Sequence, residues 1–169
     1  MKAPVRVRQV IESLSASVSS DDCRFVRSCL TPRLVELFQR LSTSDQSHAI
    51  AVARGLQRQG VGEADILQAA LLHDVGKALV RVRLWHRIAK VLAEAMAPGR
   101  DWCGPRPSAV SWHYALWVLA HHPELGADLA AAAGAGPRVV ELIRWHQSGE
   151  GAPAVLRPDL ERLRRLDNA

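Results

Sequence analysis

Apolar residues recur at spacings of three and four along most of this 169-residue chain, which is the period of an amphipathic helix. Ile66, Ala69 and Ala70 form one such stripe, and Leu160 and Leu163 belong to another. No segment shows the sustained alternation of a half-buried strand. The chain is therefore predicted to be all-α, folded as a compact, single-domain helical bundle.

The same periodicity places the individual helices. We expect them at about residues 5–17, 21–30, 32–41, 44–59, 63–74, 83–97, 110–120, 123–133, 137–147 and 158–167. Thr31-Pro32 and Gly60 supply a helix start and a helix end. The Gly- and Pro-rich stretch at 98–108 is typical of a loop.

Composition limits the cellular location and the kinds of binding partner that we expect. No run of roughly 18 uncharged apolar residues exists, so no membrane span is predicted, and the N-terminus is too polar for a signal peptide. Cys23, Cys29 and Cys103 are odd in number and lack zinc-ligand spacing, which predicts reduced thiols and a cytoplasmic location. The net charge of +5 is ordinary for an Arg-rich solvated surface, so nucleic acid is not an expected partner.

Several predicted helices carry a His or an Asp where the apolar stripe requires a core residue. These are Asp45, His48, His73, Asp74, His122, His146 and Asp167. A buried carboxylate without a partner is very costly, so it must be paired or bound to a metal. One such histidine alone is more often a satisfied core residue. Asp and His side chains that converge from four or five helices instead indicate a metal site inside a bundle.

His73 and Asp74 are adjacent, so their side chains point about 100° apart on a helix. Both reach one ion only near a helix end, which Val75-Gly76 can provide. Imidazole nitrogens and carboxylate oxygens without a thiolate suit Fe, Mn, Co or Zn better than Ca.

The run AALLHDVGKA at 69–78 resembles the motif that names the HD-domain metal-dependent phosphohydrolases. DQSHAIAVARGL before it and LRRLDNA after it fall in that family's order, so the resemblance covers about residues 41–168. We accordingly divide the chain into a helical extension packed on the core, residues 1–40, and an HD domain, residues 41–169. By similarity, the ligands of a first metal would be His48, His73, Asp74 and Asp167.

Two further segments, HHPELGADL and VVELIRWHQSG, resemble those that add histidines in the binuclear branches of the family. Matched in this way, His122 and His146 would hold a second ion, iron or manganese. His113 is the alternative if His122 points away. No Gly-Tyr-Pro follows His146, which disfavours a cyclic-dinucleotide phosphodiesterase.

The resemblance implies hydrolysis of a phosphomonoester or phosphoanhydride of a small, nucleotide-like substrate by metal-activated water. Asp74 and Lys77 would be the catalytic residues, and Lys77, Arg81 and Arg83 would bind phosphate. The cofactor would be one or two divalent ions per chain, with Fe or Mn ahead of Mg, Co, Ni and Zn.

Alternatives remain open at this point. Lys77 could instead be a cation that complements a helix end, and Arg81 and Arg83 could belong to a solvated helix face. The whole chain could be a degenerate HD domain, which binds a nucleotide or a protein partner without catalysis. The sequence leaves the oligomeric state open, a homodimer included.

Overall fold

The computed structural model describes residues 17–80, 106–108, 113–148 and 151–169. The helix expected at 83–97 lies outside these ranges, as do nearly all of the helix expected at 5–17 and of the loop expected at 98–108. Within the described ranges the regular elements are helices and no strand occurs. The prediction of an all-α fold is therefore confirmed.

The described helices fall into two runs, one that ends before residue 81 and one that begins at residue 113. In chain order they are α2 (Ser20–Cys29), α3 (Pro32–Phe38), α4 (Thr43–Arg58), α5 (Ala64–Leu72), the 3-10 helix η1 (Val75–Leu79), α7 (His113–Ala132), α8 (Pro137–Trp145), the 3-10 helix η2 (Ala154–Leu156) and α9 (Arg157–Asp167).

Local sequence sets where several helices begin. Ser19 and Asp22 form a capping box at the start of α2. The Ser42 hydroxyl oxygen accepts a hydrogen bond from the Asp45 N–H at the start of α4 and donates to the Asp45 carboxylate at 2.6 Å. Asp45, which interrupts an apolar stripe, thus takes part in a helix cap. Pro32 and Pro137 begin α3 and α8, where a missing N–H costs no helical bond.

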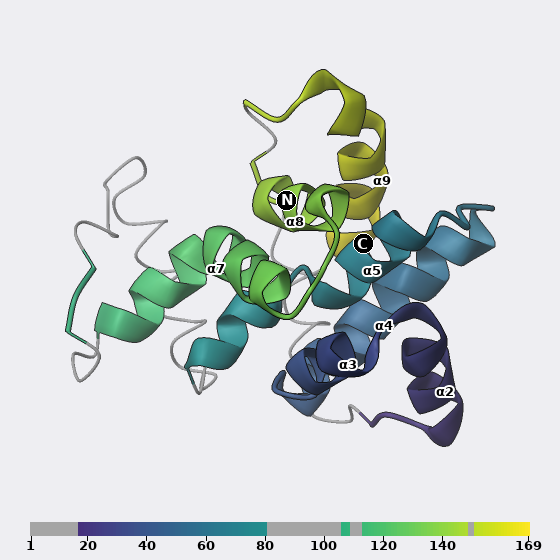
Figure 1. Cartoon of the computed structure of the whole chain (residues 1–169), viewed down its shortest axis with the longest axis horizontal. Coiled ribbons are helices and arrows are strands. Elements are labelled where there is room, and N and C mark those ends of the chain that lie inside the picture. Colours follow the sequence, from purple (N-terminus) through teal and green to yellow (C-terminus); the bar gives the residue numbers. More distant parts are fainter. Residues whose placement is uncertain (1–16, 81–105, 109–112, 149–150) are drawn as a thin grey trace.

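α4 and α5 pack side by side through the middle of the described structure, with α8 and α9 on one side and α2 and α3 on the other (Figure 1). α7 packs along η1 and α8. One apolar core joins these helices and includes Leu34, Leu56, Leu71, Leu142 and Leu163. The described part of the 1–40 extension contributes to this core, whereas the place of a domain boundary stays a prediction.

Gly55 lets α9 approach α4 closely. A Cβ atom at this position would lie 3.0 Å from the Leu166 Cδ2 atom, which is tight for two carbon atoms. Glycine inside a helix costs about 1 kcal/mol relative to alanine, so its use here indicates a packing requirement. The contact brings the end of α9, with Asp167, against the helix that carries His48.

Two predictions about helix extent are wrong. We expected separate helices at 110–120 and 123–133, but one helix, α7, runs through Pro123. Proline usually interrupts a helix because it lacks an N–H, and here a side chain bonds to the carbonyl oxygen four residues before the proline, as described below. The helix expected at 63–74 ends at Leu72, so His73 and Asp74 form the junction between α5 and η1.

The described helices test one part of the predicted location, the absence of a membrane span. None of them is long and apolar enough to cross a membrane. Cys23 and Cys29 are free thiols, whereas Cys103 lies outside the described residues. A cytoplasmic location stays a prediction.

The core predicts how stability responds to truncation of its side chains. Leu71 is fully buried, so Leu71→Ala is expected to lower the free energy of unfolding by about 2–5 kcal/mol through lost burial and a residual cavity. Urea denaturation of the metal-free protein measures this. Leu79→Ala, at a position 42% exposed, is the matched control and should cost clearly less. Equal losses would contradict the burial described above.

Candidate metal centre

Six of the predicted site residues meet inside the molecule. His73, Asp74, His122 and His146 are buried. The side chains of His48 and Asp167 are 34% and 24% exposed, so this pair forms the side of the cluster that reaches solvent.

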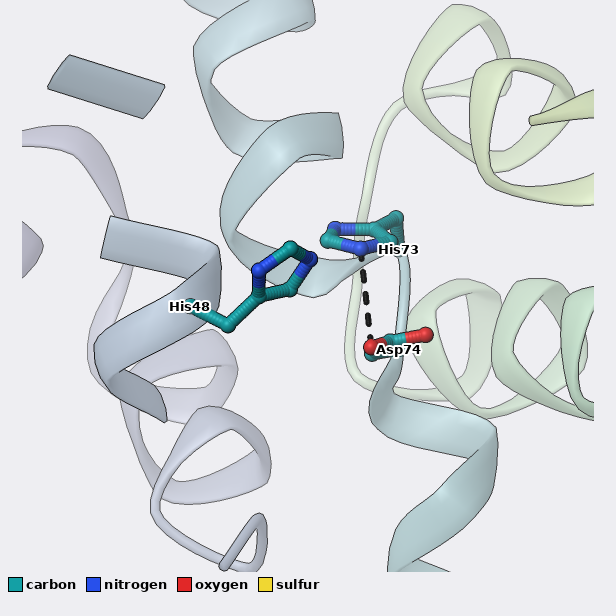
Figure 2. Close-up of side chains that lie close together, drawn as sticks. All are labelled: His48, His73 and Asp74. Carbon is teal, nitrogen blue, oxygen red and sulfur yellow. Dashed lines mark ion pairs between the residues drawn. The ribbon is translucent and has the colours of Figure 1, made fainter. Parts of the chain in front are cut away.

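Each element brings its residue to the cluster at a helix end or on an inward face. His48 comes from α4, and His73 and Asp74 come from the junction after α5; Figure 2 shows these three side chains facing one another. His122 lies in α7, and His146 caps the end of α8. Asp167 is the last residue of α9.

Two carboxylates tie the cluster together. The Asp74 Oδ2 atom lies 2.6 Å from Lys77 Nζ and 3.5 Å from His73 Nε2, and Asp74 Oδ1 lies 3.2 Å from His122 Nε2. Asp167 Oδ1 lies 2.8 Å from His48 Nε2 and 3.2 Å from His73 Nε2.

His146 is the sixth member of the cluster and lies next to two of the other histidines. Its ring centroid lies 5.1 Å from that of His73 and 5.2 Å from that of His122.

The side chains form two overlapping triads. One contains His48, His73 and Asp74, and the other contains Asp74, His122 and His146. Within each triad the potential ligand atoms lie within 4.8 Å of one another. Asp74 belongs to both triads, so a metal at either position would share this carboxylate.

The three buried histidines are oriented in the same way. Each directs Nδ1 at the carbonyl oxygen three residues earlier: His73 at Ala70 (2.8 Å), His122 at Leu119 (2.9 Å) and His146 at Ile143 (2.7 Å). A carbonyl oxygen only accepts, so Nδ1 carries the proton in these bonds.

The other ring nitrogen, Nε2, then faces the cluster. In all three residues Nε2 is buried and makes no hydrogen bond, although carboxylate oxygens lie near two of them. Buried polar atoms are normally satisfied. Metal-binding histidines show this pattern, with one nitrogen bonded to a backbone carbonyl and the other on the ion. The residues therefore fit a metal.

Gly76 sets the approach of η1 to α7. A Cβ atom on Gly76 would lie 2.1 Å from the His122 carbonyl oxygen and 2.8 Å from its Cα atom. No side chain fits there, because both obstructing atoms belong to the backbone. The close crossing brings Asp74, two residues before Gly76, to His122.

Arg164 fixes α8 to α9. Its Nε donates to the His146 carbonyl at 2.9 Å, and its Nη2 donates to the Trp145 carbonyl at 3.3 Å. These carbonyls lie at the end of α8, where no following helical N–H group is present to bond to them. The same helix carries Asp167 three residues later, so one side chain relates His146 to Asp167.

The charges of the cluster are coupled. Burial acts to lower the pKa of His73, but Asp74 and Asp167 outweigh it and raise this pKa to about 9. Burial lowers the pKa of His146 to about 3, and the charge on His73 adds to the effect.

Both carboxylates stay ionised. Burial would raise the pKa of Asp74, but Lys77 and His73 hold it well below its usual range. The hydrogen bond with His48 and the positive charge of the neighbouring His73 hold the pKa of Asp167 low against the same effect of burial. Two negative charges thus face the cationic His73 and Lys77 in the metal-free protein.

The remaining predicted residues have different outcomes. Lys77 contacts the cluster through Asp74. Arg81 and Arg83 lie outside the described residues, so their role stays a prediction. His122 points inward, which removes the need for His113 as its replacement.

Sequence reasoning gave Gly76 a role only in the helix end after Asp74, and it missed both the close crossing at Gly76 and the contacts of Arg164. The sequence shows only a glycine two residues after Asp74 and an arginine one turn before Asp167. Neither residue reveals its contact without the packing of the helices.

Comparison of the chain with protein-family models, with curated proteins and with solved structures found no match. Membership of the HD superfamily therefore stays a prediction from the motif.

Gly76→Ala tests the crossing of η1 and α7. The added methyl group would force the backbones apart, so we expect a loss of about 1–3 kcal/mol in the free energy of unfolding. Urea denaturation of the metal-free protein is the measurement. Gly62→Ala is the control, since a Cβ atom there meets nothing within 4 Å. A Gly76→Ala protein as stable as the control would contradict the close crossing.

The pKa values predict how the stability of the metal-free protein depends on pH. Between pH 3 and 6.5 the unfolded chain binds a proton at His146 that the folded chain excludes, so stability rises with pH. Between pH 6.5 and 9 the folded chain retains a proton on His73 that the unfolded chain has released, so stability falls.

Thermal unfolding in the presence of a chelator follows both arms of this profile. His73→Gln should remove the fall above pH 6.5. A wild-type protein whose stability is constant or rises from pH 6.5 to 9 would show that His73 is not held as a cation.

Proposed function

We propose that this protein is a metal-dependent phosphohydrolase of the HD type, acting on a phosphomonoester or phosphoanhydride of a small, nucleotide-like molecule. One observation carries the proposal: three buried Nε2 atoms without hydrogen bonds converge around Asp74, which two triads share. A histidine that serves only in a core satisfies both ring nitrogens. Three neighbouring histidines whose buried Nε2 atoms all lack a hydrogen bond favour a bound ion.

The donor set indicates which ions would fit. His48, His73, Asp74 and Asp167 would hold one ion, and Asp74, His122 and His146 would hold a second. Nitrogen and carboxylate oxygen donors suit Fe and Mn, with Co, Ni, Zn and Mg as further candidates. Such an ion supplies Lewis acidity, which promotes loss of a proton from water and neutralises charge on phosphoryl oxygens.

The protonation state of His73 couples metal binding to pH. With a pKa of about 9, His73 carries a proton on each ring nitrogen at neutral pH. Ligation needs the bare Nε2, so binding releases that proton. The Nδ1 atom keeps its proton because it remains bonded to the Ala70 carbonyl.

Lys77 is placed to contact a substrate phosphate. Its ammonium group lies 2.6 Å from Asp74 Oδ2, and its side chain is 22% exposed, so it links the buried carboxylate to solvent. When Asp74 serves as a ligand, its charge is compensated without Lys77. The ammonium group is then available to a phosphoryl oxygen, where positive charge stabilises the transition state.

Asp74 would also orient the water that attacks phosphorus. It is the carboxylate that both triads share, and it lies within reach of Lys77 and therefore of the phosphate. A carboxylate in hydrogen-bonding distance of the nucleophile directs it and accepts its proton. Substrate would enter from the side formed by His48 and Asp167, which are the partly exposed members of the cluster.

Turnover by metal-loaded protein tests the proposal. Protein purified without a histidine tag is reconstituted anaerobically with Fe²⁺ or Mn²⁺ and screened against nitrophenyl phosphate, nucleotides and dinucleoside polyphosphates. We expect hydrolysis that Asp74→Asn and His73→Asn each reduce by at least about 100-fold, together with loss of bound metal.

Asp128→Asn is the matched control, because Asp128 is 71% exposed and pairs with Arg144, and neither residue is a member of the cluster; it should retain metal and activity. Protein that binds metal but hydrolyses nothing would favour the degenerate, ligand-binding alternative. Protein that binds no metal would contradict the centre itself.

A further inference from the structure

His146 differs from the other buried histidines because the chain leaves the core directly after it. It follows Trp145, the last residue of α8, and the next two residues, Gln147 and Ser148, are exposed. The last buried apolar residue of α8 is Ile143. The packing of the helix body therefore holds the chain only up to one turn before His146, and helix ends fray more readily than helix interiors.

The other two buried histidines are held at their own positions by more distant parts of the chain. His73 leads directly into η1, which crosses α7 closely at Gly76, and the same crossing contacts the backbone of His122. Carboxylate oxygens lie 3.2 Å from the Nε2 atoms of both histidines. None of the ion pairs among the described residues includes His146, and its Nδ1 bond goes to Ile143 in the same helix. That bond orients the ring relative to α8 but does not place it relative to the other ligands.

Arg164 provides such a contact for His146 from α9. Its Nε donates to the His146 carbonyl at 2.9 Å, and its Nη2 donates to the Trp145 carbonyl at 3.3 Å. The two partners of the shorter bond are 18 residues apart in the chain, so the bond joins separate helices. A guanidinium group presents its donors in a rigid planar fork, whereas a lysine ammonium group acts as a single point charge. The contact with two successive carbonyls therefore requires arginine.

α9 is itself held against α4 close to Arg164. A Cβ atom on Gly55 would lie 3.0 Å from the Cδ2 atom of Leu166, two residues after Arg164. The next residue, Asp167, lies 2.8 Å from His48 Nε2. Arg164 thus links the end of α8 to a helix whose position relative to α4 is already set.

We propose that Arg164 is a positioning residue of the metal centre: the two bonds from its guanidinium group hold the backbone of His146 in place, so that His146 Nε2 stays beside Asp74 and His122 as a ligand of the second ion. This inference rests on the proposed metal centre. The triad of the first ion contains no residue that the Arg164 side chain bonds to. The role of Arg164 is accordingly specific to the second ion.

Arg164→Met removes both bonds and keeps an apolar stem. The end of α8 then moves more freely, so the dissociation constant of the ion that depends on His146 should rise about 10–100-fold, the usual effect of removing a partner of a ligand. The dissociation constant of the other ion should stay unchanged. Arg164→Lys keeps the charge without the paired donors, so it should show most of the same loss.

Arg165→Met is the matched control, because it removes the same charge from the next residue of α9, which is exposed. It should change neither dissociation constant. Calorimetric titration of the metal-free full chain with Mn²⁺ measures both binding steps, and His146→Asn identifies the step that depends on His146. Thermal unfolding with a chelator measures the stability of each variant.

A spectroscopic measurement reports on the ligand atom itself. In protein labelled with ¹⁵N, the chemical shift of His146 Nε2 shows whether this atom is bound to Zn²⁺. At a Zn²⁺ concentration that just saturates the wild type, this nitrogen should be largely unbound in Arg164→Met and bound in Arg165→Met. A loss of stability alone would not move this signal in folded protein.

Weaker binding confined to the step that depends on His146, in both Arg164 variants, supports the inference. If His146→Asn weakens binding and Arg164→Met does not, the inference is wrong and the metal centre stands. Equal weakening of both steps would make Arg164 a structural residue only, and full affinity in Arg164→Lys would show that the paired bonds are not needed. If Arg164→Met does not fold, Arg164→Lys decides by the same comparison.

The inference and the proposed function can fail separately. If the wild type binds an ion that His146→Asn does not affect, the inference fails and the first ion of the centre stands. If the wild type binds no ion, both fail.

Discussion

A carboxylate that is only 3% exposed imposes strict conditions on its surroundings, and Asp74 is such a group. It stays ionised because two cations lie next to it, with Lys77 Nζ at 2.6 Å and His73 Nε2 at 3.5 Å. Breaking a buried pair of this kind by removing one partner typically costs about 3–5 kcal/mol. The same buried charge is costly in the metal-free protein and belongs to both groups of residues that could hold a divalent ion.

The backbone then holds the ligands around this charge. Gly76 lets η1 cross α7 at His122, Arg164 ties the end of α8 to α9, and three carbonyls orient three imidazole rings. These contacts come from five helices and their junctions. A site that rigid elements fix in this way is organised before any ion or substrate arrives, which is the condition for efficient electrostatic catalysis.

Much of this followed from the sequence, because the helical period reports directly on which face is buried. His73, Asp74, His122, His146 and Asp167 stood out as polar residues on apolar stripes, and they do meet. The helical period also singled out Asp45, whose carboxylate takes part in a helix cap with Ser42. The period cannot distinguish a capping Asp from a metal ligand, because both interrupt an apolar stripe. The continuity of α7 through Pro123 could not be predicted, because a proline inside a helical pattern usually marks the end of a helix.

Anomalous X-ray diffraction from crystals grown with Mn²⁺ or Fe²⁺ tests the metal centre most directly. We predict one or two peaks beside Asp74, ligated by the Nε2 atoms of His73, His122 and His146 at roughly 2.0–2.3 Å, with each Nδ1 still bonded to its backbone carbonyl. The absence of any peak at this cluster, or ligation through Nδ1, would contradict the centre described above.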